Sequence, residues 1–201
     1  PSLYWPPVNA ATLMELDENQ YRDMDIFALM EVGRRIRKAI QKLHREGYRY
    51  PPEVGKLLAR LEAEKVPFFL GSNHEVQFVY ELLDEDYPAL GQWFPNERRF
   101  TPESPHVFIH KPNPEFISRV AACIGLDPSD IVYVGNSPSN DAPMVESGAQ
   151  VILLDKDDHY RPEIEAPEFK EEYEQALLEH RLIVLRRPKD VADTLLAHYA
   201  R

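Results

Sequence analysis

The sequence has little cysteine and no long apolar run, and each absence excludes a class of protein. Only one Cys, Cys123, occurs among the 201 residues, so an intramolecular disulfide is impossible, which suits a reducing compartment; we expect the cytoplasm. Its place in the apolar run 120–124 predicts a buried core position. No stretch approaches the roughly 18 apolar residues of a membrane span, and residues 1–7 lack the basic start and apolar stretch of a secretory signal. We therefore expect no membrane partner.

Positive charge is also scarce. The chain carries 23 Lys and Arg against 34 Asp and Glu, a formal net charge of -11, and this excess opposes binding to nucleic acid. The 7 histidines show no His-Glu-x-x-His spacing, so a zinc site of that kind is not expected. What remains is the composition of a soluble globular protein, 43% apolar and 28% charged, with a length that suits one domain.

Apolar periodicity predicts strands that alternate with helices. Strands are expected over residues 11–16, 66–70, 131–134, 151–154 and 182–185, and helices over 26–43, 51–61, 75–83, 114–126, 141–147 and 188–199. Residues 84–106 read as irregular, with one short strand at most. The alternation predicts an α/β protein in which helices cover a parallel sheet and ligands bind at the carboxyl ends of its strands.

Two groups suited to phosphate and metal chemistry stand near predicted strand ends. The strand 131–134 runs into a small-residue turn that carries Asn136 and Asp141, and a carboxylate on such a turn can supply an oxygen ligand to Mg²⁺. Upstream, Lys111 is followed by Pro112, which stiffens the backbone, and its amine can neutralise a phosphoryl group as a point charge. Each residue alone means little, but their joint spacing predicts a site.

These motifs resemble those of the haloacid dehalogenase superfamily, in its phosphatase-like branch. The segment 111–155 is similar to the third and fourth motifs, and residues 66–73, an apolar strand that ends in Ser72 and Asn73, are similar to the second. The resemblance implies a Rossmann-like three-layer α/β/α sandwich with a mostly parallel central sheet. It also implies that Ser72 and Lys111 hold the transferred phosphoryl group.

The start of the chain departs from the family's first motif, Asp-x-Asp-x-Thr, whose first Asp is the nucleophile and whose second is the general acid and base. In one register Glu15 replaces the nucleophile and Asp17 is the acid; in the other Asp17 is the nucleophile and the acid is lost. We favour the first, because Glu15 and Asp17 then share the polar side of a strand. A Glu nucleophile is one methylene longer, and a misplacement of about 1 Å can cost on the order of a hundredfold in rate.

The fourth motif departs as well. The family usually has Asp where this chain has Asn136, so a neutral amide replaces a charged ligand and magnesium binding should be weakened or lost. The resemblance implies Asp141, Asn136 and Asp17 as metal ligands. Two functions follow: a Mg²⁺-dependent phosphatase acting on a small phosphate monoester, or a catalytically degenerate protein that keeps the fold as a binding or assembly module.

The domain prediction is a single domain over residues 1–201 with two additions. A small helical cap or flap is expected at 19–50, too short for a large lid, and an acidic helical insertion at 155–181. Substrate choice in this family resides in the cap, so the expected partner is a small phosphorylated molecule without further identity. The small cap also leaves room for a homo-oligomer in which a partner subunit covers the site.

Overall fold

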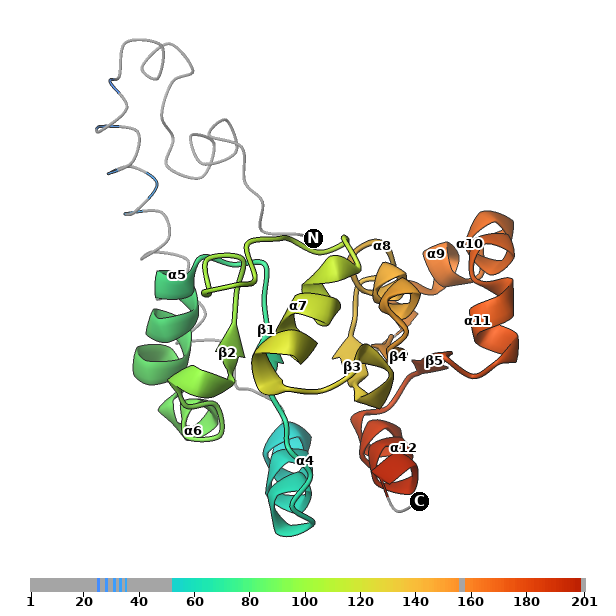
Figure 1. The fold of residues 1–201 in the computed structure, drawn as a ribbon, viewed down its shortest axis with the longest axis horizontal. Helices are drawn as coiled ribbons and strands as arrows, with labels where there is room; N and C mark the ends of the chain where they lie inside the picture. The colour runs from blue at the N-terminus through green and yellow to red at the C-terminus, as the bar shows by residue number, and fades with distance from the viewer. Residues whose placement is uncertain are drawn as a thin grey trace. The chain divides into compact units, whose positions relative to one another are not determined.

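The computed structural model describes residues 52–155 and 158–199 and, before them, only Asp25, Ala28, Glu31, Gly33 and Arg35, all but the first of these helical. By its internal contacts the chain divides into Pro1–Tyr50 and Pro51–Arg201, and the elements labelled in Figure 1 belong to the second unit. The predicted strand 11–16, nearly all of the predicted helix 26–43 and of the cap 19–50, and the candidates Glu15 and Asp17 lie outside the described residues.

The described strands are short and pair in parallel throughout. One sheet joins β1 to β2, and the other has the order β3, β4, β5. In the second sheet Val134 pairs with Ile152, and Ile152 with Ile183. Within residues 52–155 and 158–199, β1 and β3 are not paired to each other. The strands are β1 Leu70–Gly71, β2 Arg99–Phe100, β3 Val132–Gly135, β4 Gln150–Leu154 and β5 Leu182–Leu185.

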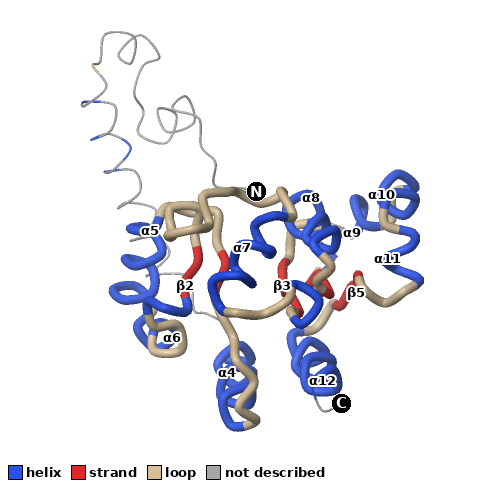
Figure 2. Tube along the Cα trace, in the orientation of Figure 1, coloured by secondary structure: helices blue, strands red, loops and turns tan. Residues whose placement is uncertain are grey.

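Helices and single helical turns connect these strands (Figure 2). The longer helices are α4 Pro52–Ala63, α7 Glu115–Ile124 and α12 Pro188–Tyr199. Shorter pieces are α5 Val76–Tyr80, α6 Pro88–Gly91, α8 Pro138–Asp141, α9 Arg161–Ile164, α10 Pro167–Glu172 and α11 Glu174–Leu178. Four further turns are 3-10 or π-helical: η1 Glu81–Asp86, η2 Asn96–Arg98, η3 Pro128–Asp130 and η4 Ala142–Ser147.

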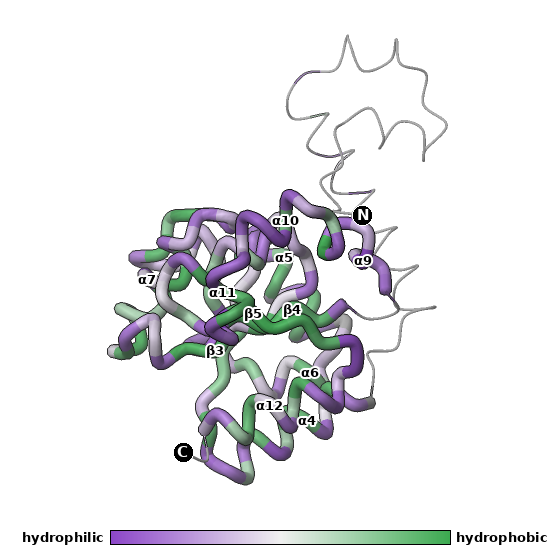
Figure 3. Tube along the Cα trace, turned by 90° about the vertical axis from the view of Figure 1, so that its right-hand side faces the viewer, coloured by the Kyte–Doolittle hydropathy of each residue, from purple (hydrophilic) through white to green (hydrophobic). Residues whose placement is uncertain are grey.

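Strand β4 is the middle of a three-layer arrangement. Its side chains alternate, so Val151 and Leu153 enter one core and Ile152 the other, all fully buried. Figure 3 shows the apolar strands β4 and β5 with α7, α10 and α11 on one side and α4 and α12 on the other. Burying such side chains contributes about 1.5–3 kcal/mol each. The predicted α/β sandwich with parallel strands is therefore present.

The two cores draw on different helices. The first joins α7, η4, α10 and α11 to β2 and β4, and includes Phe100, Phe116, Met144, Phe169 and Tyr173. The second joins α4, α5, η1 and α12 to β4, and includes Leu58, Leu61, Val79, Leu83 and Leu195. Because the first core contains residues of both sheets, α7 packs across the two. The predicted acidic segment 155–181 holds three short helices and contributes Phe169 and Tyr173 to this core.

Most predicted elements are present, and three details were wrong. Strand β5 and helix α12 have the predicted bounds. The strand expected over 66–70 begins only at Leu70, since Pro67 has no N–H for a sheet ladder. The segment expected as a helix over 141–147 is instead the 3-10 helix η4, and it follows the short helix α8. Helix α8 begins at Pro138, where the Ser137 hydroxyl caps it by accepting from the Asn140 N–H. Cys123 is exposed, because the buried face of α7 is set by Phe116, Ile117, Val120 and Ala121.

Candidate phosphate site

The predicted site residues of the second and fourth motifs follow two parallel strands directly. Ser72 comes immediately after β1, and its N–H extends the ladder by donating to the Phe100 carbonyl at 2.9 Å. Its hydroxyl oxygen accepts from the His74 N–H at 3.1 Å, which makes a tight turn. Asn136 comes immediately after β3, in the turn that leads into α8. Both turns thus stand at carboxyl ends of parallel strands, where ligands of α/β proteins bind.

Asn73 ties the β1 turn to the segment that carries Lys111. Its side-chain amide donates to the Lys111 carbonyl, and its side-chain oxygen accepts from the Lys111 N–H, both at 2.8 Å. Such a two-point contact fixes orientation as well as distance, much as a pair of strand residues does. The Lys111–Pro112 peptide bond that follows is cis. Residues 38 positions apart in sequence are therefore joined backbone to side chain.

The Lys111 ammonium lies in a closed network with two side chains of the β3 region. Its Nζ is 2.8 Å from Asp141 Oδ1 and 2.6 Å from the Tyr133 hydroxyl, which itself donates to Asp141 Oδ1 at 2.8 Å. The Lys111 and Asp141 side chains are only 12% and 4% exposed. The pair is thus a buried ion pair with each charge hydrogen-bonded, the condition under which burial of charges is tolerated.

The other carboxylate oxygen of Asp141 is held by backbone. Oδ2 accepts from the N–H of Asn136 at 3.0 Å and from the N–H of Ser137 at 2.9 Å. The side chain folds back against Gly135, where a β-carbon would collide with the carboxyl group. A glycine is therefore required at the end of β3 for Asp141 to reach the turn.

The network holds its groups in one protonation state around neutral pH. Burial alone would raise the pKa of Asp141, but the Lys111 charge and hydrogen bond, with the Ser137 N–H and the Tyr133 hydroxyl, outweigh it and hold the pKa below its ordinary value. Burial, the charge of Asp141 and the hydrogen bond to it raise the pKa of Tyr133 well above its ordinary value. The carboxylate is therefore ionised and the phenol neutral.

The structure brings some of the predicted residues together and adds two that were not predicted. Lys111 and Asp141 are in contact, and Ser72 is tied to Lys111 through its neighbour Asn73. Asn136 contributes its backbone N–H, while its side chain is exposed. The roles of Asn73 and Tyr133 were not predicted. The sequence signal for Tyr133 was a hydroxyl-bearing side chain in an otherwise apolar strand, two residues before Gly135. Because side chains alternate along a strand, positions 133 and 135 face the same side of the sheet.

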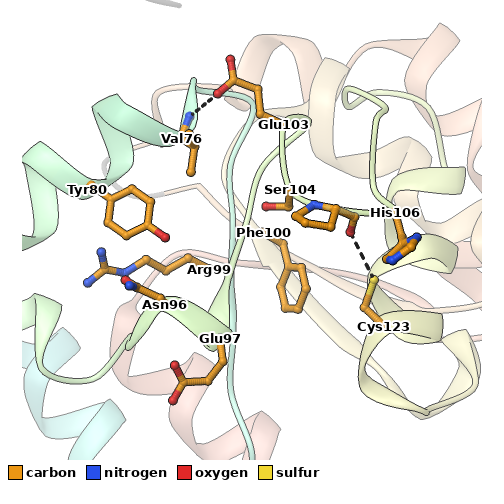
Figure 4. Close-up of a pocket in the computed structure, with 11 residues that line it drawn as sticks. Val76, Tyr80, Asn96, Glu97, Arg99, Phe100, Glu103, Ser104, His106 and Cys123 are labelled. Atoms are coloured by element: carbon orange, nitrogen blue, oxygen red, sulfur yellow. Dashed lines mark hydrogen bonds between the residues drawn. The ribbon is translucent and has the colours of Figure 1, made fainter.

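A hollow of about 350 Å³ lies elsewhere, beside β2, and holds none of the predicted site residues. Figure 4 shows Tyr80, Arg99 and Glu103 around it, with Cys123 at the other end. Two of its charged side chains already have partners within the protein: Arg99 binds Asp84 and the Phe94 carbonyl, and Glu103 accepts from the Val76 N–H. Because none of the residues implied by the motif resemblance lines this hollow, the strand-end network is the better candidate.

The described residues contain neither a clustered metal site nor a membrane helix. In residues 52–155 and 158–199, no group of three His, Cys, Asp or Glu side chains is arranged to hold a metal ion. Across the same part of the chain, none of the helices combines the length and apolar character that crossing a membrane requires. The described part of the site contains the buried Lys111 ammonium beside the Asp141 carboxylate. An ammonium can bind an oxyanion.

The fold and this network define a class, a parallel α/β protein with a lysine and a hydroxyl at strand ends. No family profile matches the sequence, and no curated protein matches it either. Solved structures do. A haloacid dehalogenase family hydrolase from Deinococcus radiodurans R1, with bound phosphate and sodium, is 18% identical at a TM-score of 0.64, over 98% of this chain and 78% of that one.

Two further solved structures agree. A putative beta-phosphoglucomutase from Thermotoga maritima is 15% identical at a TM-score of 0.63, over 95% of this chain and 83% of that one. A haloacid dehalogenase hydrolase of family IA, variant 3, from Entamoeba histolytica is 11% identical at a TM-score of 0.60, over 83% of this chain and 70% of that one. At such identities the likeness shows the fold alone. The chain has the haloacid-dehalogenase-like fold, which confirms the fold that the motif resemblance implied.

Proposed function

We propose that the protein is a hydrolase of the haloacid dehalogenase type that acts on a small phosphate monoester. The observation that carries the proposal is the double hydrogen bond of Asn73 to the backbone of Lys111, because it joins the turn of Ser72 to the residue that carries the amine. The Ser72 hydroxyl and the Lys111 ammonium can then bind oxygens of one phosphoryl group, with Lys111 offsetting the negative charge that the group carries. The neighbour from Deinococcus radiodurans contains bound phosphate, which supports this ligand class.

The attacking group comes, in this proposal, from the start of the chain. Either Glu15 is the nucleophile and Asp17 the acid and base, or Asp17 is the nucleophile. The carboxylate oxygen bonds to phosphorus as the bond to the ester oxygen breaks and the leaving oxygen takes a proton. Water then attacks the acyl phosphate, which releases inorganic phosphate and restores the carboxylate. Both residues lie outside the described part of the chain, so their roles are tested by mutation.

The described residues do not fit the magnesium ion that the fold family implies. Asp141 has two oxygens with about four lone-pair directions, and four donors already occupy them: Lys111, Tyr133 and the N–H groups of Asn136 and Ser137. The side chain of Asn136 is exposed and neutral. Magnesium dependence, with Asp141, Asn136 and Asp17 as ligands, therefore stays a prediction from the resemblance, and no step is assigned to the ion.

The test is hydrolysis of an aryl phosphate by the full chain, with magnesium or with a chelator. Wild type is compared with Glu15→Gln, Asp17→Asn and Lys111→Met, and with Lys189→Met, which removes an exposed lysine. We expect Lys111→Met to lower kcat/KM by at least about a hundredfold and Lys189→Met to leave it unchanged. No turnover above the variants, across several phosphate monoesters, would refute the hydrolase.

A binding or assembly module is the second candidate, and Asn136 favours it because this position lacks the charge that a metal ligand would supply. This candidate predicts phosphate binding without turnover. A homo-oligomer that covers the site is compatible with either function, and light scattering of the purified chain would reveal it. The cytoplasmic setting proposed from the single Cys is tested by cell fractionation.

A further inference from the structure

The misfit between Asp141 and a metal ion points to a different use of this carboxylate. We define the Lys111 corner as Lys111, Tyr133, Asp141 and the N–H groups of Asn136 and Ser137. We propose that this corner is an oxyanion site that works without a divalent cation. In it, Asp141 is the counter-ion of Lys111, whereas Tyr133 positions the ammonium. The inference rests on the proposed function only in taking phosphate as the anion.

The Asp141 carboxylate already accepts from four donors. A cation that approached Asp141 would have to displace the Lys111 ammonium or one of the two backbone N–H groups. Displacing the ammonium leaves a charge that is 12% exposed without its partner, and displacing an N–H leaves a donor of the turn unpaired. A divalent ion beside the ammonium would also be repelled by it. The ammonium therefore does at Asp141 what a metal ion would do, which is to neutralise it.

The Lys111 ammonium is held by two hydrogen bonds. Lysine has three N–H donors, and two of them are used, by Asp141 and by the Tyr133 hydroxyl. Within the described part of the chain the third has no acceptor. Because two bonds fix the Nζ, the direction of the third N–H is fixed as well. A phosphoryl oxygen placed on that donor would be bound by a pre-oriented group, which reduces the entropy lost on binding.

Tyr133 links the ammonium to the carboxylate. Its hydroxyl accepts from Lys111 and donates to Asp141, and the ammonium also lies 5.3 Å from the centre of its ring. Without the hydroxyl, Nζ would keep a single anchor and could rotate about it. Tyr133 is therefore a positioning residue: it acts on the anion through Lys111. Lysine and aspartate cancel in charge, so we expect weak binding of phosphate, on the order of 1 mM.

The test titrates inorganic phosphate into the full-length chain by calorimetry, first with EDTA and then with excess Mg²⁺. We expect the two dissociation constants to agree within about twofold, a difference of less than 0.5 kcal/mol. Phosphate binding seen only with Mg²⁺ would overturn the inference. So would binding of Mg²⁺ alone to the wild type that is lost in Asp141→Asn. The wild-type comparison needs no variant and does not depend on how a mutant folds.

Tyr133→Phe tests the positioning role, because it keeps the ring and removes the hydroxyl. We expect phosphate affinity to fall about three- to tenfold. The matched control is Tyr199→Phe, which removes a tyrosine hydroxyl in α12, outside the corner. The ammonium signal of Lys111 in nitrogen-edited NMR should shift in Tyr133→Phe and stay in Tyr199→Phe. Equal effects of the two variants, in affinity and in this signal, would overturn the role of Tyr133.

These outcomes separate the inference from the hydrolase proposal. Binding of phosphate in EDTA without turnover of any phosphate ester keeps the inference and removes the hydrolase. Turnover together with phosphate binding that requires Mg²⁺ keeps the hydrolase and removes the inference.

Discussion

The Lys111 corner and a second ion pair, Arg99 with Asp84, use buried charge in opposite ways. At the Lys111 corner the carboxylate has all its acceptor positions filled, whereas one donor of the cation has no acceptor among residues 52–155 and 158–199. In the other pair the cation is enclosed: Arg99 is 4% exposed, whereas Asp84 is 50% exposed. Its guanidinium donates to both Asp84 oxygens and to the Phe94 carbonyl, and lies 4.9 Å from the ring of Tyr80.

The two cations are suited to different uses. The planar fork of arginine has its donors in a fixed arrangement, and here they connect η1, the turn before η2 and β2 into one structural unit. Lysine is a point charge whose three donors can be shared between the protein and a ligand. The Arg99 pair therefore stabilises the fold, and the Lys111 corner keeps capacity for a ligand.

The largest expected effect is that of removing the enclosed carboxylate. Asp141→Ala leaves the Lys111 charge and the N–H groups of Asn136 and Ser137 without partners, so we expect a loss of about 3–5 kcal/mol in the free energy of unfolding. Asp84→Ala should cost about 1–2 kcal/mol, because water can reach the place of a half-exposed carboxylate and Arg99 keeps the Phe94 carbonyl. Urea unfolding measures both. Equal losses would mean that the two pairs are not built differently.

A smaller loss should follow from Gly135→Ala. The added methyl group would collide with the Asp141 side chain and push it away from the turn, at about 1–3 kcal/mol. We expect phosphate binding to be lost as well. Gly125→Ala is the control: this glycine has φ +73° and open space around it, so strain of about 1 kcal/mol should appear without any change in phosphate affinity. If Gly125→Ala also abolished phosphate binding, the effect at Gly135 would not be local.

The sequence predicts the fold further than it predicts the contacts within the site. Apolar periodicity and proline positions locate α12 and β5, because local chemistry decides where such elements begin and end. Motif spacing predicts Lys111 and Asp141 as candidate site residues. It could not show that Asn73 binds the backbone of Lys111, nor that Tyr133 completes the corner, because both contacts join segments that only the tertiary fold brings together. Burial of Cys123 failed for a related reason, since an apolar run does not reveal which face of its helix packs.

A reciprocal exchange of the two cations tests their separate roles. Arg99→Lys loses the two-point contact with Asp84, so the free energy of unfolding should fall by about 1–2 kcal/mol while phosphate affinity stays the same. Lys111→Arg keeps the charge but replaces the free donor by a planar fork, so phosphate affinity should fall by about tenfold. Unfolding and phosphate titration are run on both variants. A loss of affinity in Arg99→Lys equal to that in Lys111→Arg would remove the distinction between the two pairs.

The smallest expected effect is that of pH near neutrality. The folded-state pKa of Asp141 lies below its unfolded value of about 3.9, so its stabilisation is complete above that value and is lost as pH falls through the folded pKa. The pKa of Tyr133 is raised, so its contribution is complete below about pH 10 and is lost only at higher pH. The difference in unfolding free energy between wild type and Asp141→Asn should thus be constant from about pH 5 to 9 and shrink below about pH 4. A slope within the plateau would show that another group titrates against the Lys111 corner.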